Sequence, residues 1–300
     1  MNIFCTEIIA NKYIKAISGS SVFLSDPDEN RSVVLTNAHV ARQLLDSTKK
    51  CVGRTGSPAA TTHKLTLRYI PSFWLQNNRG YIIGDANKQS TGEFDFAIVE
   101  AERIQPKKKS VSIYDTLKTE LKFQLQDYLN TESPNSTFSQ GYIYSYPAEK
   151  TLSKNIYNPL YLKKDTMRIQ DVFASPELQE PDSLLDAYGS TNIDHGSSGG
   201  MAILQNTSNN LIGLSSILIQ PSTPQTVRIV SLKHIFSVME KELHLSQSSQ
   251  SDVYIQLLNT IKNTKISTID FINVVKNQKL TATLELQTRK TLQNIGIISK

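Results

Sequence analysis

Short apolar runs dominate the first hundred positions of the chain. Residues 16–25 (A-I-S-G-S-S-V-F-L-S) read as a strand that ends at a D-P-D-E-N turn, and residues 32–36 (S-V-V-L-T) follow as a second strand. This pattern predicts a β-hairpin. Residues 64–70 alternate between apolar and polar side chains, and residues 94–100 are again apolar, so both predict strands. Strands do not alternate with helices here, which argues against a doubly wound parallel sheet.

The pattern changes after residue 111. Apolar residues recur at every fourth position from Ile113 to Leu129 and predict an amphipathic helix of about five turns over residues 112–129. A polar segment punctuated by prolines occupies residues 149–190 and reads as an insertion. The predicted strands on either side of that insertion are residues 141–146, 201–204 and 211–219.

The last 60 residues read as mostly helical. Residues 235–243 and 254–261 have helical spacing, whereas residues 280–286 alternate as a strand would and stay ambiguous. This extension either packs on the preceding domain or binds a partner, and the sequence does not choose between the two.

Composition limits the broad class of protein. The chain has 300 residues and 33.6 kDa, of which 39% are hydrophobic and 20% charged, as in folded globular proteins. Two structural units, or one unit with two lobes, are expected at this length. The net charge of +5 is spread along the chain, and the run at residues 107–109 follows Pro106 as a loop would. We therefore expect no nucleic-acid partner.

The cysteines and the termini bear on cellular location. Two cysteines, Cys5 and Cys51, exclude a disulfide-dense scaffold and any zinc site with four cysteines. No apolar stretch approaches the roughly 18 residues of a membrane-spanning helix. Glu7 interrupts what would be the apolar core of a signal peptide. The sequence predicts a cytoplasmic protein with no membrane span and leaves non-classical delivery to another cell open.

Three short motifs carry candidate chemistry. They are T-N-A-H-V at residues 36–40, F-D-F-A-I-V at residues 94–99 and D-H-G-S-S-G-G at residues 194–200. They contribute, in this order, His39, Asp95 and Ser198. A serine hydroxyl needs a base to take its proton, and the base needs a carboxylate to fix its tautomer and stabilise the imidazolium. These residues are therefore the candidate catalytic set.

The glycines of the third motif suggest a further role. The backbone N–H groups of Gly196 and Ser198 are candidates for an oxyanion hole, because Gly196 has no side chain to block an inward turn. No metal-binding spacing and no H-E-x-x-H motif occurs, and neither a Walker-type loop nor a dinucleotide fingerprint is present. The sequence therefore predicts no metal and no cofactor.

In these motifs the chain resembles the trypsin/chymotrypsin-like serine proteases (clan PA). Within that family, the residues of its motifs are most similar to those of the Deg/HtrA-like bacterial branch. T-N-A-H-V is similar to that branch's histidine motif, and G-S-S-G-G resembles its G-N-S-G-G. S-G-S-S-V-F-L-S, Q-G-Y-I-Y-S-Y-P and L-I-G-L-S-S-I also resemble family strands. The resemblance covers residues 8–240, and no PDZ-like module follows it.

The resemblance implies a mainly β fold with two antiparallel six-stranded β-barrels, an inserted helix and a mostly helical C-terminal extension. The protease domain would span residues 1–240 and the extension residues 241–300. Within the domain, the implied parts are barrel 1 at about 8–110, an inter-barrel helix at about 112–129 and barrel 2 at about 136–235. The site would lie between the barrels.

The chain also departs from the family pattern. Ser197 replaces the aspartate that pairs with a new amino terminus in many digestive-type members. Counting back six residues from Ser198 places Asn192 at the floor of the specificity pocket, where strict preference for lysine or arginine would need an acidic residue. Ser216 would bind substrate backbone, and Leu218 would narrow the pocket toward small or medium aliphatic side chains. His195 would lie at the rim.

The leading hypothesis is a serine endopeptidase that acts on protein or peptide substrates through an acyl-enzyme. A catalytically silent peptide-binding module on the same fold is the alternative, as is a single-target protease acting as a virulence or defence effector. A regulatory protein partner would contact residues 241–300 or 149–190. A lipase or esterase is disfavoured because that fold places the carboxylate between serine and histidine in chain order.

Overall fold

The computed structural model describes most of the chain outside two long segments. The described residues are 1–9, 13–24, 30–56, 59–88, 92–104, 140–147, 162–175, 184–189, 193–204, 211–220, 225–246 and 278–299. The helix predicted over 112–129 and the helical spacing at 254–261 lie outside them.

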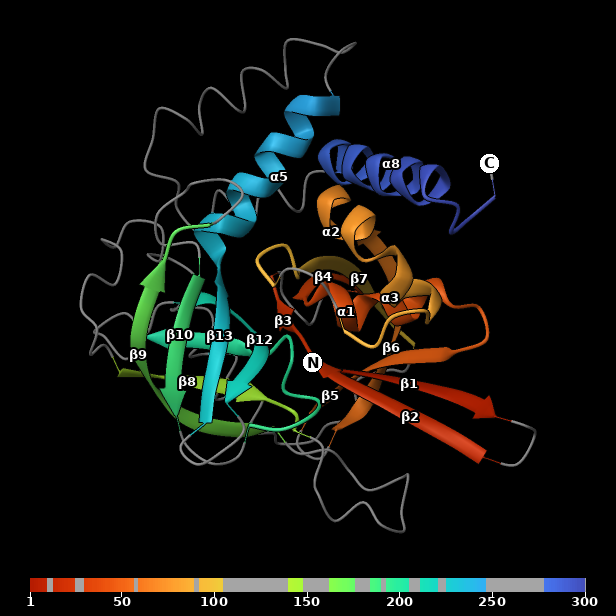
Figure 1. Ribbon diagram of the computed structural model, residues 1–300. Coiled ribbons are helices and arrows are strands. Elements are labelled where there is room, and N and C mark those ends of the chain that lie inside the picture. Colours follow the sequence, from red (N-terminus) through yellow and green to blue (C-terminus); the bar gives the residue numbers. More distant parts are fainter. Residues whose placement is uncertain are drawn as a thin grey trace.

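The first sheet is built from the N-terminal third of the chain. It has seven strands in the order β2-β1-β5-β6-β7-β4-β3, and each pairing is antiparallel. The sheet curls into a half-barrel (Figure 1). Its strands are β1 (Asn2–Ile9), β2 (Tyr13–Ser20), β3 (Val22–Phe23), β4 (Arg31–Thr36), β5 (Lys50–Gly56), β6 (Ala59–Tyr69) and β7 (Ala97–Arg103).

The second sheet is a closed six-stranded barrel. Its strands follow the order β10-β13-β12-β11-β8-β9, and again every pairing is antiparallel. The two sheets lie side by side (Figure 1). The strands of the barrel are β8 (Gln140–Ser145), β9 (Lys163–Phe173), β10 (Leu184–Gly189), β11 (Met201–Leu204), β12 (Leu211–Gln220) and β13 (Gln225–Ser231).

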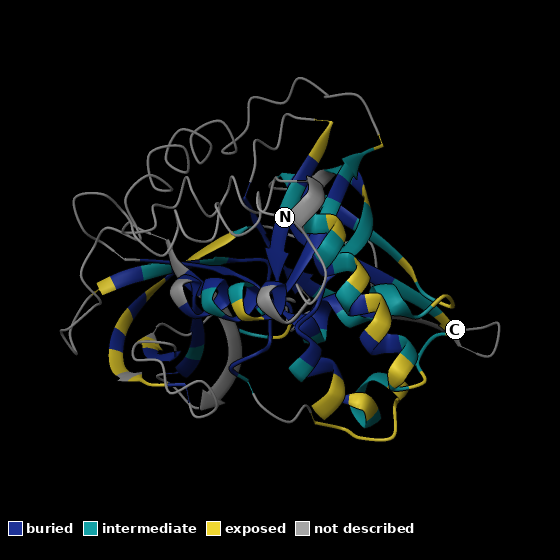
Figure 2. Ribbon diagram, turned by 90° about the horizontal axis from the view of Figure 1, so that it is seen from above, coloured by how far each residue is buried: buried dark blue, intermediate teal, exposed yellow. Residues whose placement is uncertain are grey.

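Apolar side chains from both sheets form one large buried cluster, and two smaller clusters lie apart from it. Leu35, Ile98 and Phe96 of the first half belong to the same buried cluster as Ile143 and Ile229 of the barrel. Figure 2 shows the buried residues gathered where the two sheets meet, and the exposed ones on the outer faces of the helices and at strand ends. Apolar burial of this kind is the main stabilising term in folding, so the two halves depend on each other for stability.

Helices cover one end of the molecule (Figure 1). The last strand of the barrel leads directly into α5 (Leu232–Ser246), and α8 (Gln278–Asn294) packs on β6, α5 and α2. The short helices α2 (Ser72–Asn77) and α3 (Arg79–Ile83) follow β6. A short helix α1 (Ala38–Ala41) and a 3-10 turn (Arg42–Leu45) follow β4.

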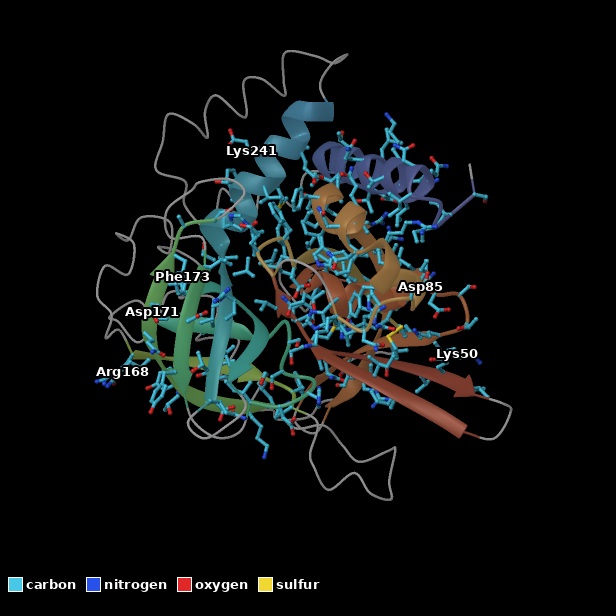
Figure 3. The ribbon with its side chains drawn as sticks, viewed as in Figure 1. Lys50, Asp85, Arg168, Asp171, Phe173 and Lys241 are labelled. Atoms are coloured by element: carbon cyan, nitrogen blue, oxygen red, sulfur yellow. A yellow bond between two sulfur atoms is a disulfide. The ribbon has the colours of Figure 1, made fainter. Side chains whose placement is uncertain are left out.

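A disulfide joins the two cysteines of the chain. Cys5 of β1 and Cys51 of β5 are directly opposite each other in the strand pairing, with Cα atoms 4.0 Å apart. The bond lies within the first sheet (Figure 3). The bond was not predicted, because disulfides are rare in the cytoplasmic location expected from the sequence. That location stays a prediction. Among the described residues, no helix is both long and apolar enough to cross a membrane.

The mainly β, two-sheet architecture predicted from the sequence is confirmed, with differences in detail. The first sheet has seven strands and is a half-barrel, where six strands and a closed barrel were expected. The hairpin was right, because β3 pairs with β4. The interpretation of 149–190 as a polar insertion was wrong in part, because β9 and β10 lie in it and complete the barrel. Residues 280–286 are helical.

Candidate active site

His39 lies in α1, immediately after the end of β4. The short helix begins after Asn37, whose carbonyl oxygen accepts a hydrogen bond from the Ala41 N–H at 2.9 Å. Ala38 and Ala41 are fully buried, which anchors the helix to the first sheet and leaves the half-buried His39 side chain 20% exposed. The imidazole is thus held by a buried helix and still reaches solvent.

Asp95 is a fully buried carboxylate that contacts His39 twice. Its Oδ2 lies 2.7 Å from Nδ1 of the ring, and its Oδ1 accepts the His39 backbone N–H at 2.9 Å. The Asn37 side-chain amide donates to the Asp95 carbonyl oxygen at 2.6 Å. The carboxylate therefore fixes both the backbone and the ring of His39, and a ring with Nδ1 protonated leaves Nε2 free to accept a proton.

Residues 194–200, here called the glycine loop, lead directly into β11. The loop contains two positive φ angles, 93° at Gly196 and 83° at Gly199. A Cβ at Gly199 would collide with the carbonyl oxygen of Ser20 and with Oγ1 of Thr36. Only glycine meets both requirements at position 199, because an L side chain rarely adopts such φ values and has no room here.

The two serines of the glycine loop differ in their surroundings. Ser197 is 2% exposed, its Oγ lies 3.1 Å from the donating Oγ of Ser145, and its N–H donates to the Asp194 carbonyl at 2.9 Å. Ser198 is only partly buried. A nucleophile must reach its substrate, so the partly exposed Ser198 is the better candidate of the two.

Two hydrogen bonds connect the glycine loop to the segment that carries His39. The Ser20 N–H donates to the Ser198 carbonyl oxygen at 2.7 Å, and the Thr36 hydroxyl donates to the Ser20 carbonyl oxygen at 2.7 Å. Thr36 precedes His39 by three residues. The loop of the second sheet is therefore fixed against the part of the first sheet that presents the histidine.

The structure gives only backbone positions or exposure for three of the remaining predicted site residues. His195 is exposed, and its backbone N–H donates to Oδ1 of Asp194 at 2.7 Å. Ser216 lies at a register shift of β12, and Leu218 pairs with Val227 of β13. Asn192 lies outside the described residues. The substrate-binding roles of these four residues stay predictions.

Sequence reasoning missed Ser20 as a participant in this region. Ser20 is the last residue of β2 and is 1% exposed, with contacts to both the glycine loop and Thr36. The signal was present in the S-G-S-S run that resembled a family strand. That run was read only as a strand marker, because nothing in it indicates which polar groups face another segment.

Two other histidines, His63 and His234, are buried. Burial lowers the pKa of His63 to about 4 and that of His234 to about 4, because desolvation penalises the charged ring. His63 lies 3.1 Å from the Thr55 hydroxyl, and the His234 ring packs near that of Phe94. Over the described part of the chain, no group of three or more His, Cys, Asp or Glu side chains could hold a metal ion.

No protein-family model and no curated protein sequence matches the chain. Solved structures that resemble it include proteases and an inactivated protease paralogue. The scabies mite inactivated protease paralogue S-I1 has 15% identity and a TM-score of 0.47, with 80% of this chain and 92% of that one covered. The protease Anisep from Arthrobacter nicotinovorans has 15% identity and a TM-score of 0.43, with 79% of this chain and 93% of that one covered.

A third similar structure is an HtrA-type protease, AlgW, with a decapeptide. It has 13% identity and a TM-score of 0.44, with 81% of this chain and 63% of that one covered. The sheet order and strand pairing of the chain itself define a trypsin-like fold of two curled antiparallel sheets. With TM-scores below 0.5 and identities of 13–15%, the likeness to the solved proteases supports no statement about the activity of this chain.

Proposed function

We propose that the protein is a serine endopeptidase in which His39, Asp95 and Ser198 form a catalytic triad. The observation that carries the proposal is the double contact between Asp95 and His39, at 2.7 Å and 2.9 Å, beside a glycine loop that bears a partly exposed serine. A buried carboxylate on Nδ1 favours the tautomer in which Nε2 can accept a proton.

In the proposed reaction, Ser198 Oγ attacks the carbonyl carbon of a peptide bond while His39 takes the hydroxyl proton. The backbone N–H groups of Gly196 and Ser198 would stabilise the oxyanion of the tetrahedral intermediate. As this intermediate collapses, the C–N bond breaks and His39 gives its proton to the leaving amine, which leaves an acyl-enzyme. A water molecule, activated by His39, then hydrolyses the ester and regenerates Ser198.

Substrate recognition is proposed from chain position alone. Asn192 at the pocket floor and Leu218 on its wall would favour small or medium aliphatic side chains, because a buried cationic side chain would have no acidic partner. Ser216 would bind the substrate backbone and His195 would lie at the rim. No cofactor takes part in this scheme.

A fluorophosphonate probe, which reacts with activated serines, tests the proposal directly. We expect the wild type to label and both Ser198→Ala and His39→Ala to lose labelling. Asp95→Asn should label about 10³–10⁴-fold more slowly, because the amide no longer holds the productive tautomer. Asp85→Asn is the matched control, since Asp85 is exposed (Figure 3) and should label as the wild type does.

Folding of each variant is followed through Trp74, the one tryptophan of the chain, which is fully buried. A wild type that is folded by this measure and does not label contradicts the proposal. It would instead favour a peptide-binding module without catalysis.

A further inference from the structure

Ser20 connects four segments of the molecule through its three polar groups. Its N–H donates to the Ser198 carbonyl oxygen at 2.7 Å, and its hydroxyl donates to the Gly196 carbonyl oxygen at 2.7 Å. Its own carbonyl oxygen accepts the Thr36 hydroxyl at 2.7 Å, and its Oγ accepts the Tyr146 N–H at 2.8 Å. The connected segments are β2, the end of β4, the glycine loop and the residue after β8.

The Ser20 hydroxyl has a fixed direction. Because its oxygen accepts the Tyr146 N–H, its single proton is directed to the Gly196 carbonyl oxygen. Ser20 is 1% exposed, so these bonds are shielded from solvent. Buried polar groups that lose their partner cost more free energy than an ordinary hydrogen bond contributes, and this arrangement therefore resists rotation of the Gly196 carbonyl.

Ser20 holds the glycine loop on both sides of Ser197. Each peptide unit is planar, so a fixed carbonyl fixes the whole plane. The hydroxyl of Ser20 fixes the peptide between Gly196 and Ser197, and its N–H fixes the peptide between Ser198 and Gly199. The Ser198 N–H, one of the two proposed oxyanion donors, belongs to the peptide between these two.

We infer that Ser20 is a positioning residue, whose hydroxyl keeps the glycine loop in the geometry that the proposed oxyanion hole needs. The inference rests on the proposed function. Without the hydroxyl, the Gly196 carbonyl loses its partner and the adjacent peptide units gain freedom to rotate. The contact between His39 and Asp95 does not involve Ser20 and remains, so the base keeps its function while stabilisation of the oxyanion declines.

The test compares fluorophosphonate labelling of Ser20→Ala with that of Ser21→Ala. Ser21 is the matched control, because its buried hydroxyl also donates to a backbone carbonyl, that of Met1 at 2.9 Å, and does not contact the glycine loop. We expect Ser20→Ala to label about tenfold more slowly, or slower still, per folded molecule. Ser21→Ala should label at close to the wild-type rate.

The pH profile separates positioning from general damage. Because His39 keeps its partner, the pH of half-maximal labelling should be unchanged in Ser20→Ala while the plateau rate falls. Ser20→Thr retains the hydroxyl and should recover most of the rate. If Ser20→Ala does not fold, Ser20→Cys replaces it, since a thiol fills the space and is only a weak donor.

Two outcomes would overturn the inference, and they can be told apart. A wild type that labels, together with a folded Ser20→Ala or Ser20→Cys that labels as fast as Ser21→Ala, refutes the role of Ser20 and leaves the protease proposal standing. A folded wild type that does not label refutes the proposed function and this inference with it.

Discussion

At the scale of single residues, the structure separates glycines that look alike in backbone geometry. Gly199 and Gly84 have nearly equal φ angles of 83° and 87°. An added Cβ at Gly84 would meet nothing within 4 Å, whereas one at Gly199 would collide with Ser20 and Thr36. Substituting each of these two glycines by alanine therefore measures the effect of close packing at Gly199, because the backbone cost is the same at both positions.

We expect Gly199→Ala to destabilise the protein more than Gly84→Ala does. The backbone cost of a left-handed conformation, about 1–2 kcal/mol, is common to both variants. Gly199→Ala adds an overpacking cost of about 1–3 kcal/mol and displaces the glycine loop. Urea unfolding followed by Trp74 fluorescence measures the difference, and Gly199→Ala should also lose probe labelling. Equal free energies of unfolding would contradict the packing argument.

At the scale of elements, a buried carboxylate joins three helices. Glu242 of α5 accepts the Ser72 N–H of α2 at 2.5 Å, and the Ser72 hydroxyl lies 3.2 Å from its other oxygen. The Thr291 hydroxyl of α8 donates to Ser72 Oγ at 3.0 Å. Burial raises the pKa of Glu242 to about 7, although the bonds to Ser72 partly oppose that rise. The junction therefore contains a carboxyl that titrates near neutral pH.

This carboxyl makes stability depend on pH in a defined direction. In the unfolded chain Glu242 ionises near 4.5, and in the fold it keeps its proton up to about 7. The contribution of Glu242 to the free energy of unfolding is therefore at its maximum below pH 4.5, and it is lost as the pH rises through 7. The pKa of Glu242 rises from 4.5 in the unfolded chain to about 7 in the fold. At about 1.36 kcal/mol per pKa unit, the unfolding free energy changes by about 3 kcal/mol.

Glu242→Gln removes this dependence. From pH 4.5 to 7.5, the unfolding free energy of the wild type should fall steadily relative to that of Glu242→Gln. His63 and His234, with lowered pKa values of about 4, change stability in the opposite direction below pH 6.5, but both proteins share them. Parallel curves of stability against pH for the two proteins would refute the assignment.

At the scale of the whole molecule, the C-terminal helix is part of the folded core. Leu284 and Leu292 of α8 are buried in the cluster that includes residues of both sheets. Arg68 of β6 donates to Glu285 of α8 at 2.6 Å, and the Ile70 N–H donates to Thr288 at 3.2 Å. Of the two roles considered for the extension, packing on the preceding domain holds for α8.

Two leucines of α8 provide the test at this scale. Leu292 is 4% exposed and Leu286 is 50% exposed. We expect Leu292→Ala to lower the free energy of unfolding by about 2–5 kcal/mol, because it leaves a cavity in the shared core. Leu286→Ala should change it by no more than about 0.5 kcal/mol. Similar small effects in both variants would show that α8 is not part of the cooperative unit.

Several features of the fold could be predicted from the sequence because their signals are local. The runs that became β4, β8, β11 and β12 were recognised by their apolar patterns, since strand propensity and alternation are read over a few residues. β9 was missed because its segment is rich in polar residues and its buried side chains alternate with exposed ones. β10 was missed although Leu184, Leu185 and Ala187 are all buried, because its short apolar run lies within that polar segment. In α8, the sequence of residues 280–286 alternates between apolar and polar side chains as in a strand. These residues nevertheless form a helix, which packs against β6 and α5.

The candidate site divides in the same way. The motifs alone specify which chemical groups are available and their chain order, His39, Asp95 and Ser198, because a motif depends only on neighbouring residues. The three-dimensional fold brings Asp95 to 2.7 Å from His39 and places Ser20 in hydrogen-bond contact with the glycine loop. Such contacts join positions 56 and 176 residues apart, and they depend on how the sheets curl and pack, which no local pattern encodes.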